Sequence, residues 1–348
     1  MTANTFVRSN EIYMFIPLRR SPFGKGIPLG QKYCVVCRHV MRNAQISKEV
    51  IMKKIFIGLL VLLILSGAGK IFAHPGSAIV ADRQGNVYFL DTGSGLWKID
   101  RAGKLTHLTG PAFHWMAIDN DGRFSDGTIQ NLMFDGTTIT SVGTHPTLLL
   151  SSDFPIAIGS DGNLYYPKMD PDKQMQVLRR TSSGSTTVVK RKSPAQKESG
   201  QISWWNGIAT SPDGSIYYSE DRAVRKISPK GELTTVISNF NLTSCDSVPG
   251  VESDLGEFYR GLDVDSEGTV YVAATGCRAV FKITADHKVA TVLRAESPWS
   301  PTAVALSGKD LYVLEYFHTP GENRREWLPR VRKVSSDGSI VMVATVKR

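Results

Sequence analysis

The sequence lacks the short motifs that define several large enzyme classes. It has no G-x-S-x-G nucleophile turn, no phosphate-binding P-loop and no G-x-G-x-x-G dinucleotide fingerprint. These absences argue against the hydrolases, nucleotide-dependent enzymes and dinucleotide-dependent enzymes that those motifs identify. Any catalytic or binding site must therefore be sought in residues brought together by the fold.

Outside its first residues, the chain also lacks a net charge. The whole chain carries a net charge of +9, and residues 1–73, with 11 basic and two acidic side chains, account for all of it. The other 275 residues contain 30 basic and 30 acidic side chains. Because a basic surface is the first requirement for binding a phosphate backbone, we expect no nucleic-acid partner.

The one long apolar run, residues 55–65, is too short to cross a bilayer, which takes about 20 residues. Lys53 and Lys54 precede it, and small residues at 66–68 follow. This order is typical of a secretory signal peptide, so we expect a periplasmic or secreted protein. The alternative is an uncleaved segment that anchors the chain in the membrane.

Met52 stands directly before the basic pair, at the position where an ordinary signal peptide would start. We therefore divide the chain into a probable non-native or disordered leader (1–51), a signal peptide (52–73) and a folded domain (74–348).

Cysteines are few. Cys34 and Cys37 form a C-x-x-C in the leader without a second pair, so we do not interpret them as a metal or redox site. Cys245 and Cys277 are the other two, and in an exported chain two cysteines favour one disulfide. The alternative is two free buried thiols.

A repeat of about 45 residues runs through the folded domain. Each copy has a polar turn with glycine, followed by a short strand of β-branched and aromatic residues, as in Pro212-Asp-Gly-Ser-Ile-Tyr217. Asp-Gly and Asn-Gly supply the positive φ of tight hairpins. The six copies start at Asp82, Asp119 (a weaker copy), Ser160, Pro212, Asp265 and Ser307.

Each turn is preceded by an apolar strand, such as residues 207–209, and two more strand patterns follow in most copies. Four antiparallel strands make a blade with two apolar faces, which must stack on neighbouring blades. We therefore predict an all-β fold, a six-bladed β-propeller of four-stranded antiparallel blades over 74–348. The last strand, 340–346, belongs to the last blade alone, so we expect no blade shared between the termini.

The stretches 206–218 and 260–272 resemble the NHL-repeat and regucalcin/gluconolactonase-like (SMP-30-like) group of six-bladed propellers. This group includes lactonases, lyases and pure binding modules. The resemblance implies a divalent metal (Ca, Mg, Mn or Zn) held in the central channel by Glu, Asn and Asp. Asn206 matches the Asn, but Arg260 stands at the Asp position and Ser77 at the Glu position, so the ligand set is incomplete.

Residues that precede first strands and follow second strands converge at one mouth of such a channel. We expect Glu315 and His318 to act there as orienting acid and base, and Arg260 to hold an anionic group or a developing oxyanion. His114, His145 and His318 are an alternative transition-metal set. Ligand-binding candidates are His114, Trp205, Asn206, Glu220, Tyr259, Tyr316 and, in a long loop of the last blade, Trp327.

Two functions follow from this pattern. The first is a module that binds a small molecule, peptide or glycan, or another protein, through its channel-mouth loops. The alternative is a periplasmic hydrolase or lyase, gluconolactonase-like, that acts on a small lactone, ester or sugar acid. The sequence leaves open whether the chain is an enzyme.

Overall fold

The computed structural model describes residues 6–8, 11–13, 78–110, 113–124, 130–134, 137–143, 145–172, 174–192, 205–220, 222–238, 259–317 and 328–347. The chain divides into two units, Met1–Ile71 and Phe72–Arg348. In the first, β1 (Phe6–Arg8) pairs with β2 (Glu11–Tyr13). Within the described residues, no helix has the length and apolarity to span a membrane.

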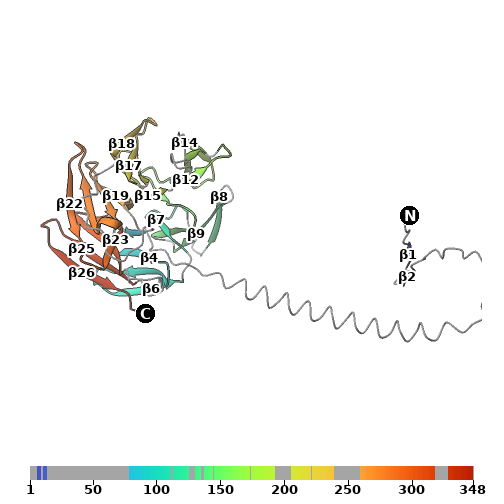
Figure 1. Cartoon of the computed structure of the whole chain (residues 1–348), viewed down its shortest axis with the longest axis horizontal. Helices are drawn as coiled ribbons and strands as arrows, with labels where there is room; N and C mark the ends of the chain where they lie inside the picture. Colours follow the sequence, from blue (N-terminus) through green and yellow to red (C-terminus); the bar gives the residue numbers. More distant parts are fainter. Residues whose placement is uncertain are drawn as a thin grey trace, which may run out of the picture. The chain divides into compact units, whose positions relative to one another are not determined.

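The second unit consists of six four-stranded antiparallel sheets, which confirms the predicted propeller (Figure 1). We number these blades one to six. Blade one contains β3 (Ile79–Ala81), β4 (Val87–Asp91), β5 (Gly95–Ile99) and β6 (Leu105–Thr109); blade two β7 (Trp115–Asp119), β8 (Gln130–Phe134), β9 (Thr137–Val142) and β10 (Thr147–Ser151); blade three β11 (Ala157–Ile158), β12 (Leu164–Met169), β13 (Met175–Arg180) and β14 (Thr186–Lys192). Blade four contains β15 (Trp205–Thr210), β16 (Ile216–Glu220), β17 (Ala223–Ile227) and β18 (Leu233–Ser238); blade five β19 (Tyr259–Val264), β20 (Val270–Ala274), the 3-10 turn η3 (Thr275–Cys277), β21 (Ala279–Ile283) and β22 (Val289–Arg294); blade six β23 (Trp299–Ser307), β24 (Asp310–Phe317), β25 (Pro329–Val334) and β26 (Ile340–Thr345).

The repeated turn folds the same way in several blades. In blade one, the Asp82 carbonyl accepts the N–H of Gly85, which has a φ of +82° that L side chains rarely adopt. The Asp82 carboxylate accepts the N–H of Asn86 at 2.7 Å and the hydroxyl of Tyr88 at 3.1 Å. The same carboxylate–tyrosine contact joins Asp161 to Tyr165 in blade three, at 2.7 Å. The turn motif of the sequence is therefore a hydrogen-bonded unit that ties each hairpin to its own strand.

Six apolar clusters fill the six interfaces between neighbouring blades. The interface of blades four and five, for example, contains Ala209 and Tyr217 from one blade with Leu262 and Val272 from the next. Equivalent clusters join the other neighbours in chain order around the ring. Burial of apolar surface between blades is thus what stabilises the ring.

Within the described residues, the ring closes by side-chain packing and a hydrogen bond rather than by a shared strand. Ile79 and Phe89 of blade one pack against Ala305 and Val331 of blade six. The Tyr316 hydroxyl of blade six donates to the Leu90 carbonyl of blade one at 2.9 Å. Since β26 pairs with β25 of its own blade, the prediction that no blade is shared is confirmed.

Blade two departs from the pattern. The turn at Asp119 forms, with Gly122 at φ +66°, but Arg123 and Phe124 do not continue into a strand beside β7. The chain instead forms β8 and β9 first and returns to β7 with β10. The sequence identified this copy as degenerate, but the expectation that a second strand follows its turn is wrong. Phe124 belongs to no strand, and its side chain is buried in the apolar cluster between blades two and three.

Candidate functional site

The innermost strands of all six blades line a central cavity of about 190 Å³. Its walls are the apolar side chains and backbone of β3, β7, β11, β15, β19 and β23. Asp263 of β19 is the one ionisable residue among those that line it. At about 190 Å³ the cavity is smaller than the roughly 300–1,000 Å³ of most drug-sized ligand sites, so it suits only a small ligand.

Asp263 joins two blades from inside this cavity. Its carboxylate accepts the N–H of Val264 at 2.8 Å and, across the blade interface, the N–H of Leu306 at 2.8 Å. Burial raises the pKa of Asp263 to about 6, and the two hydrogen bonds only partly oppose that shift. The sequence analysis missed Asp263, although a polar residue in an otherwise apolar inner strand was a visible signal.

Polar contacts between blades cross one end of the cavity, and one of them joins blades that are not neighbours. The indole Nε1 of Trp115, at the start of β7, donates to the carbonyl of Asn206 at 3.3 Å. Asn206 belongs to blade four, so the indole reaches past blade three. The Asn206 amide in turn donates to the Tyr259 carbonyl of blade five at 3.0 Å. The starts of the first strands of blades two, four and five thus meet at one mouth.

Arg260 lies beside this chain of contacts. Its carbonyl accepts the Ser219 hydroxyl at 2.6 Å, which fixes its backbone to blade four. Its Nε is buried and has no hydrogen-bond partner in the part of the chain that the structure describes. Burial lowers the pKa of Arg260 to about 10, so the guanidinium is still charged at neutral pH. The residue as a whole is partly exposed, so the cost of this unpartnered Nε is only part of the several kcal/mol that a fully buried, unpaired cation would carry.

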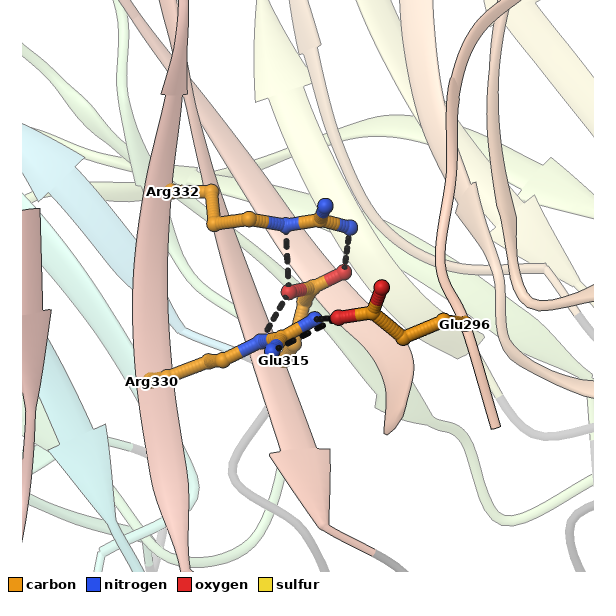
Figure 2. A network of polar contacts seen from close by, with 4 residues as sticks. All are labelled: Glu296, Glu315, Arg330 and Arg332. Atoms are coloured by element: carbon orange, nitrogen blue, oxygen red, sulfur yellow. Dashed lines mark hydrogen bonds and ion pairs between the residues drawn. The ribbon is translucent and has the colours of Figure 1, made fainter. Parts of the chain in front are cut away.

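Glu315 has a different environment from the one expected. Figure 2 shows its carboxylate held between Arg330 and Arg332 of the adjacent strand β25. Arg330 Nε donates to it at 2.6 Å, while Arg332 donates through Nε at 2.7 Å and through a terminal nitrogen at 2.5 Å. Arg330 also contacts the exposed Glu296 at 3.3 Å and lies over the Trp299 ring at 4.0 Å. The Glu315 carboxylate is fully buried in this network.

The same pair of residue types recurs in blade four. Glu220, at the equivalent end of β16, accepts Arg225 Nε at 2.7 Å. Arg225 pairs with the residue two before Glu220, and Arg332 with the residue two before Glu315. The two acidic candidates therefore occupy one repeated position, where each carboxylate ties the second strand to the third. The pairing with arginine explains why an acid is present at each position, and no bound ligand is needed to explain it.

Three of the aromatic candidates are buried in the apolar clusters between blades. Trp205 is buried and stacks on Tyr218 with ring centroids 3.6 Å apart. Tyr259 is buried in the cluster between blades four and five, and Tyr316 makes the ring-closing contact described above. His114 lies against Trp115 with centroids 5.5 Å apart, and burial lowers its pKa.

Some candidates fall outside the described residues. His318, Trp327 and Cys245 are among them, so the expected Glu315–His318 pair stays a prediction. Cys277 is buried in η3 and its sulfur is not free, but its pairing with Cys245 stays a prediction as well.

The side chains at the mouth do not fit the divalent metal that the resemblance implies. Asn206 is in place, with its amide nitrogen donating to Tyr259, but Arg260 brings a cation to the position of a second ligand. Within the described ranges, no group of three or more His, Cys, Asp or Glu could hold a metal ion. His114 and His145 lie near opposite ends of the β7–β10 pair, so the expected three-histidine set does not assemble.

Comparison with known proteins supports the fold and a family resemblance. Residues 155–315 match the family model described as SMP-30/Gluconolactonase/LRE-like region, which confirms the resemblance predicted from the repeats. No curated protein sequence matches the chain.

Solved structures are similar at low sequence identity. A catalytically inactive virginiamycin B lyase from Staphylococcus aureus is 14% identical with a TM-score of 0.44, over 78% of this chain and 85% of the lyase. Regucalcin from Agrobacterium tumefaciens, titled a calcium-binding protein, is 16% identical with a TM-score of 0.43, over 69% and 81%. A luciferin-regenerating enzyme is 17% identical with a TM-score of 0.42, over 71% and 84%. At these values, none of the three bears on what this chain binds.

Proposed function

We propose that this propeller binds a small organic anion, such as a carboxylate, at the channel mouth, with Arg260 as the counter-charge. The observation that carries the proposal is the buried Arg260 Nε without a partner among the described residues. Because no carboxylate of the described residues pairs with this Nε, a bound anion would recover solvation that the guanidinium has lost.

The surroundings support binding at this position. The Trp115–Asn206–Tyr259 contacts hold the mouth in one arrangement, and Ser219 fixes the Arg260 backbone. A site built on strands is pre-organised, so less free energy is lost on binding. Polar groups around one buried charge are what a selective small-molecule site uses.

Isothermal titration calorimetry tests the proposal. Glucuronate and gluconate are titrated against the wild-type protein and Arg260→Gln, with neutral methyl glucoside as the uncharged comparison. We expect the acids to bind the wild type and to lose about 30-fold or more in affinity in the variant. Arg294→Gln, at an exposed residue of β22, is the matched control and should bind as the wild type does. Equal affinity in Arg260→Gln, or no binding of either acid, would overturn the proposal.

A second candidate is a hydrolase or lyase acting on a small lactone, ester or sugar acid. The match of residues 155–315 to the SMP-30/Gluconolactonase/LRE-like region favours it. In that reaction Arg260 would stabilise the developing oxyanion. Turnover of a lactone and ester panel, lost in Arg260→Gln, would support this candidate. Binding of these compounds without turnover would favour a binding module over an enzyme.

We also propose that the protein acts outside the cytoplasm. The basic, apolar and small-residue order of residues 53–68 supports this. Peptide mass spectrometry of cytoplasmic and extracytoplasmic fractions from its own cells should find the folded domain outside the cytoplasm, without peptides from residues 1–68. Recovery of the domain only in the cytoplasmic fraction would contradict the proposal.

A further inference from the structure

The outer edge of blade six carries a run of exposed apolar side chains. β26 is the last strand in the order β23–β24–β25–β26, so no strand among the described residues pairs with its outer side. Ile340, Val341 and Met342, three consecutive residues at its start, are 44%, 48% and 49% exposed. An exposed apolar edge strand of this kind is a template for pairing with another chain.

The outer strands of blades four and five differ from β26 in this respect. The exposed positions of β18 are threonine and serine, and those of β22 are alanine, threonine and arginine. Charged side chains or proline usually protect an edge from pairing, but residues 339–346 contain neither. The apolar character of residues 340–342 is therefore not a general property of the outer strands.

Packing between blades leaves these three side chains uncovered. Further along the strand, Ala344 and Val346 are buried in the cluster that joins blade six to blade one. Residues 340–342 belong to none of the six apolar clusters in the part of the chain that the structure describes. They pair with β25 in regular register, and the bulge of this pair comes only after Met342. A regular, uncovered stretch of strand is thus available at the outer edge.

The charges at the two ends of β26 fit a second copy of the same strand. Asp337 lies in the turn before β26 and Lys347 directly follows the strand's last residues, and both side chains are exposed. In an antiparallel pair of β26 strands, Lys347 of each copy lies near Asp337 of the other. A parallel pair would place like charges together, which is unfavourable.

We propose that β26 pairs with β26 of a second copy of this chain, antiparallel, about a twofold axis near Met342. Each copy uses the same edge, so the contact is complete in a dimer and does not extend further. Strand pairing buries less area than the roughly 1,600 Å² of a standard interface, so we expect a dissociation constant of about 1–100 µM. The proposal is independent of the Arg260 site, which belongs to an inner strand of another blade.

Sedimentation velocity of the purified protein between about 1 and 200 µM tests the proposal. We expect a monomer–dimer equilibrium in the wild type. Met342→Lys should weaken the dimer about ten-fold or more, because two ammonium groups would then face each other across the twofold axis. Leu108→Lys, at a similarly exposed apolar residue of the outer strand β6, is the matched control and should dimerise as the wild type does.

Lys347→Glu tests the antiparallel orientation. It places a carboxylate near Asp337 of the second copy and should weaken the dimer about three-fold or more at low salt. Lys230→Glu, at an exposed lysine of the turn between β17 and β18, should leave the dimer unchanged. An equal dimer in Lys347→Glu and the wild type would overturn the antiparallel orientation.

Circular dichroism shows whether each variant folds. If Met342→Lys does not fold, Val341→Thr decides the question, because it keeps a β-branched side chain and still removes apolar surface from the edge. It should weaken the dimer by a smaller factor. A wild type that is monomeric over the whole concentration range, or a dimer that the folded edge variants leave intact, would overturn the proposal.

Discussion

At the scale of single residues, the buried charges divide into two kinds. Glu315 and Glu220 are acids whose charges are met by arginines of the same blade. Arg260 and Asp263 are charges of the inner strand β19 that no opposite charge meets within the described residues. Charges of the first kind hold a blade together, whereas those of the second kind are costly to the fold and therefore point to function or to pH response.

Replacing Glu315 tests the structural role of the first kind. Glu315→Gln leaves Arg330 and Arg332 buried beside a neutral amide, so we expect a loss of about 3–5 kcal/mol in the free energy of unfolding. Denaturant unfolding measures this loss. The control is Asp310→Asn, which breaks a partly exposed pair with Lys333 and should cost about 1 kcal/mol or less. Equal losses in the two variants would contradict a structural role for Glu315.

Asp263 predicts a dependence of stability on pH. Its folded pKa of about 6 lies above its ordinary value, so the folded state holds the proton more tightly than the unfolded state. The contribution of this residue is therefore most favourable below pH of about 4 and is lost as the pH rises through about 6. We expect the free energy of unfolding to fall by up to about 1.4 kcal/mol per pH unit across this window.

Asp263→Asn removes the titrating group and should flatten that slope. Chemical denaturation of the wild type and the variant between pH 4 and 7 measures the difference. A slope of the same size in both proteins would assign the pH response to other groups. Asp286→Asn, at an exposed turn whose pKa is lowered rather than raised, is the comparison variant.

At the scale of strands and turns, much of the structure could be predicted from local chemistry. Turns such as Asp82–Gly85 form because the aspartate side chain and the glycine φ are both needed there. The path of blade two could not be predicted, because the strand that lies beside β7 comes about 28 residues later in the chain and local patterns do not report such pairings.

The candidate site was predicted in part, for a physical reason. The expectation of a site at one mouth follows from the periodicity of the strands, and the structure brings the Asn206 side chain and the start of β19 together. The roles of Glu315 and Glu220 did not follow, because the arginines that meet them are on a different strand. The reach of Trp115 across the ring depends on the width of the channel, which the sequence does not encode locally.

The turn after β20 carries a prediction of its own. A Cys245–Cys277 disulfide would tie η3 to the segment before blade five and stabilise the fold by about 3–4 kcal/mol. Cys245→Ser and Cys277→Ser should then have equal effects, and the double variant should lose no more than either one. Unfolding under non-reducing conditions measures all three. Additive losses, or two free thiols in the denatured wild type, would contradict the disulfide.

At the scale of the whole molecule, the propeller is a ring that is stabilised by apolar packing between neighbouring blades. The six apolar clusters alternate with the blades, and no strand among the described residues is exchanged to close the ring. Packing thus accounts for the fold without Arg260. Since the fold does not need this cation, its removal should not harm the empty protein.

Thermal unfolding of the wild type and Arg260→Gln, each with and without saturating glucuronate, tests this account most directly. The account predicts that the empty variant unfolds at the same temperature as the wild type or higher, because a buried unpaired charge is gone. Glucuronate should raise the Tm of the wild type by roughly 2–4 °C or more and leave the variant unchanged. An empty variant that unfolds well below the wild type, or one that glucuronate stabilises as much, would contradict it.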